Sequence, residues 1–421
     1  MFPLILLYLV LTIVRPQDYM PALIGVPVLP VVLILAFLCW LGSKERTFAA
    51  PQFAILPVFM LVLMISQATN GWTGGMLDQA AKFGPTVISF FILAAACTQK
   101  RRVEISMAVI VLCSFVLAMH GVDQSNSGVG WTGIPVGEDG RIQYVGIFND
   151  PNDLGLLFVA SVPMAIYLGR KSGALGKLFW YAGTLLLLYG IRLTDSRGAM
   201  LAVLVMAGVY VWYRRGAMLA AVLGVVGLTV MKLLSSRMQD LDAGEESANG
   251  RVDAWYSGLH MFMSHPLFGV GAGNFTEYND LTAHNSFVLV LAEAGFAGYV
   301  LWLAFVGYSF WMMWLVLRYK PDVAQFPEDA AQWQIERPLA LTLFIALCGM
   351  FTTAFFLSRS YMIVLYLILA IAVGYFVGAR KRMPGMANYR ITRNWWRWVP
   401  AAMGSIAGLY VLVAILLRTA G

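Results

Sequence analysis

The chain has 421 residues, of which 60% are hydrophobic and only 12% are Asp, Glu, Lys or Arg. A soluble protein of this length would carry roughly twice that charged fraction, so we exclude a soluble globular fold. The net charge of +7 follows from the membrane topology described below, and it does not indicate nucleic-acid binding.

Apolar segments recur along the whole chain at the length that a bilayer requires, and they predict an all-α polytopic integral membrane protein with about 12–13 transmembrane helices. The first segment is short and is expected to pair with the second as a hairpin. The expected spans are 2–14, 20–41, 50–68, 76–97, 104–120, 152–169, 176–191, 198–213, 216–234, 285–317, 338–357, 361–379 and 398–417.

Turns rich in Lys and Arg alternate with turns that are poor in them. Because cytoplasmic turns carry the excess of Lys and Arg, the basic turns are expected inside and the turns between them outside. The four cysteines lie singly within apolar segments, which indicates neither a disulfide nor a metal site. The basic turns are 44–46, 100–102, 170–171, 214–215, 318–320 and 380–382.

Two outer segments, 121–151 and 235–284, are too long to be simple turns. Within the second, apolar residues recur at helical spacing from Arg251 to Met263, which predicts a helix lying in the membrane plane before the tenth span. The span that starts at His284 would be about 34 residues and roughly 50 Å long, against a hydrocarbon core near 30 Å. We therefore expect a break near Gly295–Gly298.

These segments divide the chain into three parts. Residues 1–120 are expected to form N-terminal transmembrane helices, and residues 121–317 a core that carries both long outer loops. Residues 318–421 are expected to form C-terminal transmembrane helices. They include a basic cytoplasmic segment, 380–397, that is typical of an anchor for anionic lipid.

Three helices are expected to begin at the outer face next to polar clusters, after 149–153, after 194–198 and at 282–285. Helix N-termini present N–H groups and a partial positive charge, which favour phosphate. Arginines on the outer side run against the usual charge bias, and guanidinium binds phosphate oxygens in a bidentate way. An anionic ligand is therefore indicated. The basic residues expected there are Arg141, Arg192, Arg197, Arg251 and His284.

Simpler interpretations remain open for each residue alone. An outer arginine can contact a lipid headgroup or pair with Asp195 or Asp253, and His284 can be a capping residue. The carboxyl of Glu293 can be neutral in an apolar neighbourhood or can pair with an arginine.

The polar segments occur together in an order that resembles the O-antigen ligase family, which also contains O-antigen polymerases and bacterial protein O-oligosaccharyltransferases. The resemblance covers about residues 140 to 310. The matching motifs are Gly146-Ile147-Phe148-Asn149-Asp150-Pro151-Asn152-Asp153-Leu154, Thr194-Asp195-Ser196-Arg197-Gly198-Ala199, Gly250-Arg251 with Trp255, His265-Pro266-Leu267-Phe268-Gly269-Val270-Gly271, and Ala283-His284-Asn285-Ser286-Phe287 with Glu293-Ala294-Gly295.

The resemblance implies a GT-C-type glycosyltransferase in the bacterial inner membrane. It would move a glycan from undecaprenyl diphosphate to an acceptor hydroxyl, such as one on lipid A core, at the periplasmic face. Arg197 and Arg251 would bind the diphosphate and His284 would act on the acceptor hydroxyl, without metal or cofactor. The supporting candidates are Arg141, Asn152, Asn285 and Glu293.

Three other functions are compatible with the same sequence. One is a non-catalytic scaffold in an export complex, for which His284→Ala would retain function. A polymerase would extend a polysaccharide on the same carrier and would share the donor chemistry. A polysaccharide transporter would place charges near the bilayer midplane, often in paired halves, whereas here the charges gather at one face and no repeat is visible. The short outer loop before His284 argues against the larger protein-glycosylating members.

Overall fold

The computed structural model describes residues 1–137, 139–234, 241–387 and 394–420, with the backbone alone for 230–234, 241–249 and 419–420. The described chain is almost entirely helical. Residues 235–240 and 388–393 are not described. The predicted outer segment 235–284 and the predicted anchor 380–397 therefore lie partly outside the described residues, and Arg390 and Arg393 of the anchor lie outside them entirely. The helices are α1 (Phe2–Ile13), α2 (Val28–Leu41), α3 (Gln52–Thr69), α4 (Gly75–Ala96), α5 (Lys100–Ser127), α6 (Pro151–Lys171), α7 (Ala174–Leu193), α8 (Arg197–Arg215), α9 (Ala217–Leu234), α10 (Leu241–Ser264), α11 (Phe275–Tyr278), α12 (Ser286–Arg318), α13 (Asp329–Ala354), α14 (Ile363–Arg382) and α16 (Trp398–Ala420).

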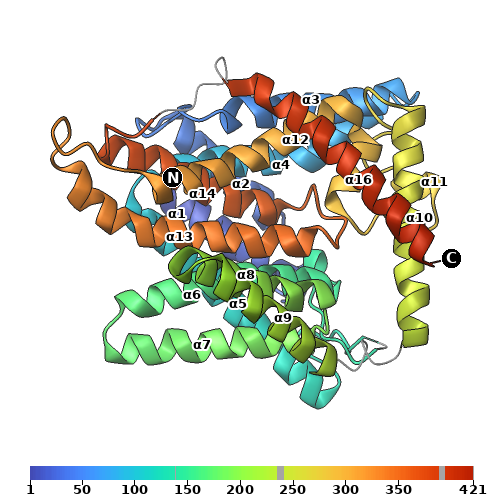
Figure 1. Cartoon of the computed structure of the whole chain (residues 1–421), viewed down its shortest axis with the longest axis horizontal. Coiled ribbons are helices and arrows are strands. Elements are labelled where there is room, and N and C mark those ends of the chain that lie inside the picture. Colours follow the sequence, from blue (N-terminus) through green and yellow to red (C-terminus); the bar gives the residue numbers. More distant parts are fainter. Residues whose placement is uncertain (138, 235–240, 388–393, 421) are drawn as a thin grey trace.

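Every predicted span corresponds to one of these helices, so the polytopic helical fold is confirmed. Within the described residues, nine helices are long and apolar enough to cross a membrane. Three shorter apolar helices, Phe2–Ile13, Val28–Leu41 and Ala217–Thr229, accompany them. The first two pack against each other as the predicted hairpin (Figure 1).

Three predicted boundaries were wrong. Helix α13 begins at Asp329 and not at 338. Helix α2 begins at Val28 and not near residue 20, because Pro27 precedes it and Gly25 adopts a positive φ of 81°. Helix α5 continues to Ser127, so the first outer loop begins after it and not at 121. The polar last turns of α5 remain helical because the side chain of Gln124 donates to the carbonyls of Ile134 and Pro135 in the loop that folds over them.

The basic turns lie at one end of the helix bundle, and three of their basic residues form ion pairs there. Arg102 binds Glu45 at 2.5 Å, Lys171 binds Glu104 at 2.5 Å and Arg382 binds Glu336 at 2.7 Å. Each pair joins segments that are far apart in the sequence. The alternation of basic turns therefore corresponds to the two ends of the bundle, as the charge pattern predicted.

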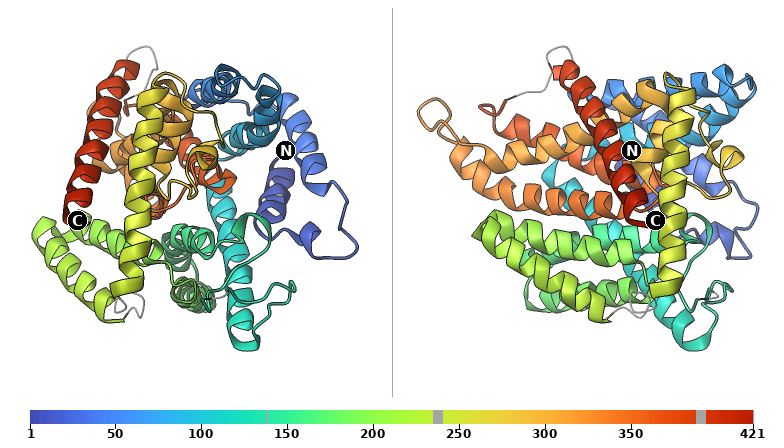
Figure 2. Two further views of the ribbon diagram at one scale, coloured as in Figure 1. Left: turned by 90° about the vertical axis from the view of Figure 1, so that its right-hand side faces the viewer. Right: turned by 45° about the vertical axis from the view of Figure 1, so that its right-hand side comes forward.

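Helix α10 crosses the opposite end of the bundle at a steep angle to the helices behind it (Figures 1 and 2, yellow). The orientation agrees with the prediction of a helix in the membrane plane, but α10 is longer than Arg251–Met263 because it begins at Leu241. The hydroxyl of Tyr410 on α16 donates to the carbonyl of Leu259 at 3.3 Å. Helix α16 therefore contacts α10 toward the C-terminal end of α10.

Helix α12 is broken where the sequence predicted. Gly295 has φ 62° and ψ −163°, which is a backbone conformation open almost only to glycine. The break separates a short buried first segment from the long span. Breaking a helix leaves N–H and C=O groups without helical partners, and in a nonpolar interior each must find another.

The loop 265–273 supplies those partners. The amides of Phe296 and Ala297 donate to the carbonyls of Pro266 and Leu267, at 2.8 and 3.2 Å. In return, the amide of Val270 donates to the carbonyl of Ala292 at 2.9 Å. The motif His-Pro-Leu-Phe-Gly-Val-Gly thus stabilises the break in α12 by backbone hydrogen bonds.

Candidate active site

Three helices begin at the end of the bundle that α10 crosses, each with a side chain capping its first turn. Asp150 caps α6 by accepting from the amide of Asn152 at 2.8 Å, and Pro151 is the first helical residue. Ser196 caps α8 by accepting from the amide of Ala199 at 3.4 Å. Asn285 caps α12. The three predicted N-termini are therefore present, and Asn285 rather than His284 caps the third.

The starts of α6 and α8 touch each other. A Cβ atom placed on Gly155 would lie 2.9 Å from the Cβ of Ala199 and 3.5 Å from the Cβ of Ser196. Glycine is needed there because the two helix starts approach too closely for a larger residue. Arg141 fastens the contact, because its Nη2 donates to Asn152 Oδ1 at 3.0 Å and its Nε donates to the carbonyl of Thr194 at 2.7 Å.

The turn between α13 and α14 joins α12 to this pair. The hydroxyl of Ser286 donates to the carbonyl of Leu357 at 2.6 Å and accepts from the amide of Arg359 at 3.1 Å. Phe355 in this turn packs against Phe287 of α12 and Trp255 of α10, with ring centroids 5.9 and 5.7 Å apart. Segments separated by more than two hundred residues therefore meet at one place.

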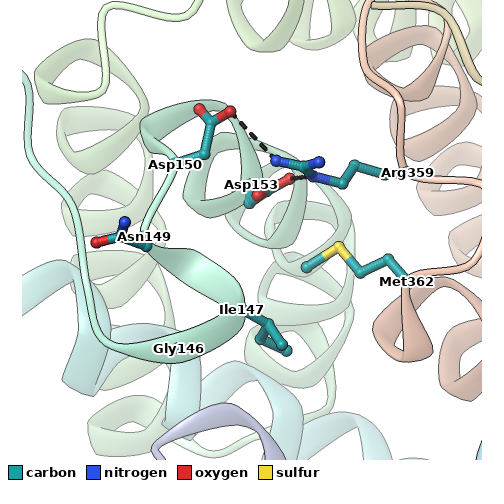
Figure 3. Close-up of a pocket in the computed structure, with 7 residues that line it drawn as sticks. All are labelled: Gly146, Ile147, Asn149, Asp150, Asp153, Arg359 and Met362. Atoms are coloured by element: carbon teal, nitrogen blue, oxygen red, sulfur yellow. Dashed lines mark hydrogen bonds and ion pairs between the residues drawn. The ribbon is translucent and has the colours of Figure 1, made fainter. Parts of the chain in front are cut away.

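Arg359 is the residue at this junction that sequence reasoning missed. Its Nε binds Asp153 at 2.6 Å and its Nη2 binds Asp150 at 3.3 Å, as Figure 3 shows. The argument applied to the other outer arginines would have found it, because it is a basic residue in an outer turn poor in Lys and Arg. It was overlooked because the last hundred residues resemble the family only in being hydrophobic.

Arg359 also lines a cavity of about 400 Å³. One wall comes from the segment that precedes and begins α6, and the other from the turn before α14 (Figure 3). The lining residues are Gly146, Ile147, Asn149, Asp150, Asp153, Arg359 and Met362.

His284 stands immediately before the cap of α12, half-buried, with a positive φ of 46°. Its pKa is lowered from the ordinary imidazole value, first by burial and then by the nearby charge of Arg251. Asp150 acts in the opposite direction and Arg359 in the same direction as Arg251. The imidazole therefore lies within electrostatic range of charged groups from α6, α10 and the α13–α14 turn.

The two predicted diphosphate-binding arginines lie at the same end of the bundle. Arg197 is the first residue of α8, and a Cβ on the adjacent Gly198 would lie 3.3 Å from Phe356 in the α13–α14 turn. Arg251 lies on α10, one turn before Trp255, and its charge acts on His284. Both side chains are partly exposed.

Two predicted supporting residues have structural contacts. Asn285 is fully buried, and its side-chain oxygen accepts from the amides of Phe287 and Val288 at 2.9 and 3.2 Å. Glu293 is 2% exposed and accepts from the amide of Phe275 at 3.2 Å. Both therefore contribute to the shape of the α12 start and of the loop that supports its break.

The described residues contain no group of three or more His, Cys, Asp and Glu side chains that could hold a metal ion. Metal independence of the reaction stays a prediction.

The segment that holds most of these candidate residues matches a known protein family. Residues 182–303 match the O-antigen ligase family. The resemblance seen in the sequence motifs is thereby confirmed for the segment that holds Arg197, Arg251 and His284. No curated protein matches the chain.

The O-antigen ligase match covers 122 of the 421 residues, from 182 to 303. The match begins within α7 and ends early in the long part of α12, so it includes α8, α10 and the loop 265–273. The start of α6 and the α13–α14 turn lie outside it. All the cavity-lining residues belong to those two outer parts.

Proposed function

We propose that this protein transfers a glycan from undecaprenyl diphosphate to an acceptor hydroxyl at the periplasmic face of the bacterial inner membrane, in the manner of an O-antigen ligase. Lipid A core is the acceptor class that the family resemblance favours. The observation that carries the proposal is the meeting of Arg251, His284 and Arg359 with three capped helix N-termini at one end of the bundle.

In the proposed reaction the acceptor oxygen attacks the anomeric carbon of the donor sugar and the bond from that carbon to the diphosphate breaks. His284 accepts the proton of the acceptor hydroxyl. The departing diphosphate gains negative charge in the transition state, and Arg197 and Arg251 together with the N-terminus of α8 stabilise it. Fixed cations are effective here because they need no reorganisation during the reaction.

The surroundings of His284 support the role of a base. A base must be neutral before it accepts a proton, and burial together with the charge of Arg251 favours the neutral imidazole. Asp150 opposes this effect and stabilises the imidazolium once it forms. Burial and Arg251 outweigh Asp150, so the net effect favours the neutral resting base.

A reaction with purified protein tests the proposal directly. The protein in detergent is mixed with a lipid-diphosphate-linked glycan and an acceptor such as lipid A core, and the joined product is measured. Product in the absence of any membrane gradient is expected and would exclude a pure transporter. Activity that survives a chelator is expected as well, and a loss restored by added divalent cation would contradict the metal-free mechanism.

A polymerase would use the same donor chemistry, and the family match supports this alternative function equally. The two differ in what accumulates in a deletion strain. Accumulation of lipid-linked polymer identifies a ligase, because finished chains are no longer transferred. Accumulation of single lipid-linked repeat units identifies a polymerase.

A further inference from the structure

The cavity is lined by Asp150 and Arg359, whose charges act on His284, and its chemical character differs from that of Arg197 and Arg251. Two carboxylates, Asp150 and Asp153, hold the one guanidinium that lines it, Arg359. A guanidinium paired in this way offers little net attraction to an anion, and the excess carboxylate repels one. The cavity is therefore unsuited to phosphate.

Its lining suits neutral hydroxyl groups. Carboxylate oxygens accept hydrogen bonds, guanidinium and amide N–H groups donate them, and a hydroxyl does both. Asn149, Asp150 and Arg359 supply all these functions on the lining. Ile147 and Met362 add apolar surface, and Gly146 adds bare backbone (Figure 3). A pyranose ring has this combination of polar edge and apolar face.

The size of the cavity agrees with a short saccharide. Its volume of about 400 Å³ lies near the lower end of the range of about 300–1,000 Å³ for small-ligand pockets. Its rigidity comes from the pairing of Arg359 with Asp153, a carboxylate that is 2% exposed. A buried charge pair of this kind holds the two walls in one register.

We infer that this cavity is the acceptor subsite and binds a neutral sugar residue of the acceptor glycan beside His284. The assignment of the cavity to the acceptor rests on the proposed function. The assignment to a saccharide rests on the lining residues. Asp150 and Arg359 line the cavity and also act on His284, the group assigned to the acceptor hydroxyl. The lining residues all fall outside the family-matched segment 182–303. Five of them belong to the family-like motif at 146–154, and Arg359 and Met362 lie outside every motif that carries the resemblance.

Three substitutions probe the subsite with little effect on the fold. Asn149→Ala removes an exposed amide, and Asp150→Asn keeps the cap of α6 because Asn caps as well as Asp. Met362→Ala removes apolar surface. Asp280→Asn is the matched control, because Asp280 is exposed on the same face and lies outside the cavity. Thermal melting of each variant in detergent verifies that it is folded.

Steady-state transfer kinetics then separate acceptor from donor. Each of the three variants is expected to raise the acceptor KM by roughly fivefold, as expected for a lost hydrogen bond or apolar contact of about 1 kcal/mol, and to leave the donor KM within about twofold. Asp280→Asn should change neither. A rise in donor KM with an unchanged acceptor KM would overturn the inference and give the cavity to the donor glycan.

Binding without turnover distinguishes this inference from the proposed function. Saturation-transfer NMR is recorded with methyl glycosides of glucose, galactose and N-acetylglucosamine, and with glucose 6-phosphate as the anionic probe. We expect a neutral glycoside to bind the wild type and to lose its signal in Asp150→Asn and Asn149→Ala. If a neutral glycoside binds in this way but the protein shows no transfer activity, the proposed glycosyltransferase function is refuted and the saccharide subsite stands. Failure of all three neutral glycosides, or binding of the phosphate probe that needs Asp150, would refute the saccharide subsite.

Discussion

Two residues of the candidate active site hold a backbone conformation that is unusual for them. Asp195 and His284 have φ values of 45° and 46°. Each stands directly before the residue that caps a helix, Ser196 or Asn285. A left-handed conformation in a residue other than glycine costs on the order of 1–3 kcal/mol and is found most often at functional sites. The cost here is offset by the capped helices that follow.

The environment of His284 predicts a pH profile. Because the pKa of His284 is lowered, the neutral base persists below the ordinary imidazole value of about 6.5. The acidic limb of kcat/KM is therefore expected below pH 6.5, with activity lost as the pH falls through it. Asp150→Asn removes a charge that raises this pKa and should move the limb to still lower pH. A limb above 6.5, or an upward shift in Asp150→Asn, would contradict the assignment of the base.

The arginine at the start of α8 has a natural control in the same turn. Arg197→Ala is expected to abolish transfer, lowering kcat/KM by about 10²–10³ or more, because a fixed donor to the departing diphosphate is lost. Arg192→Ala removes the same charge from an exposed side chain that pairs with Asp195 and should retain most activity. Transfer rates of both purified variants, with expression and melting verified, give the comparison. An equal loss of transfer activity in both variants would show that Arg197 acts only as a general surface charge.

The site residues that could be predicted from the sequence were those whose charge is unusual for their expected side of the membrane. Arg141, Arg197 and Arg251 stood out because outer-face arginine opposes the charge bias. Arg359 has the same signal but no family motif around it, and it was missed. The functions of Asn285 as a cap and of Glu293 as an acceptor for a loop amide depend on neighbours in three dimensions.

At the scale of the elements, the break in α12 is the feature that shapes the site. Length alone predicted it, because a helix of that many residues exceeds the bilayer. The sequence did not reveal that the loop 265–273 supplies the missing hydrogen bonds, because pairing between loop and helix leaves no periodic signal. The predicted helix within 251–263 was likewise shorter than α10, whose polar N-terminal half lacks an apolar stripe.

Gly295→Ala tests the break. A Cβ there would lie 2.5 Å from the backbone carbon of Leu267, and φ is 62°. We expect a loss of at least about 1–3 kcal/mol in the free energy of unfolding, from the strained backbone and the clash. Gly208→Ala is the control, because nothing lies within 4 Å of its Cβ position in α8, and it should be neutral or stabilising by up to about 1 kcal/mol. Thermal or denaturant unfolding in detergent measures both, and equal stability would show that the loop does not fix the break.

For the whole molecule, hydropathy and the alternation of basic turns predicted the helices and the two ends of the bundle. They could not predict which outer turns meet, because periodicity describes one helix and not its neighbours. The contact between the start of α6 and the α13–α14 turn, through Asp153 and Arg359, is of this kind. Knowledge of it required the three-dimensional structure.

Sidedness can be measured with cysteine labelling in a background that lacks the exposed Cys39. Tyr278 and Val323 are 54% and 59% exposed and lie at opposite ends of the bundle. Tyr278→Cys is expected to react with a membrane-impermeant maleimide in cells with a permeabilised outer membrane, and Val323→Cys only after lysis. The reverse pattern would place the arginine cluster in the cytoplasm, away from the proposed substrate.

The proposed lipid-diphosphate site around His284 is tested most directly by single-turnover transfer, which yields donor affinity and the rate of the chemical step together. In Arg251→Ala we expect donor affinity to fall. In His284→Ala we expect donor affinity to be unchanged while the chemical step slows by about 10²–10⁴, the usual contribution of a general base. If instead Arg251→Ala binds donor as the wild type does and His284→Ala transfers at the wild-type rate, the account is contradicted.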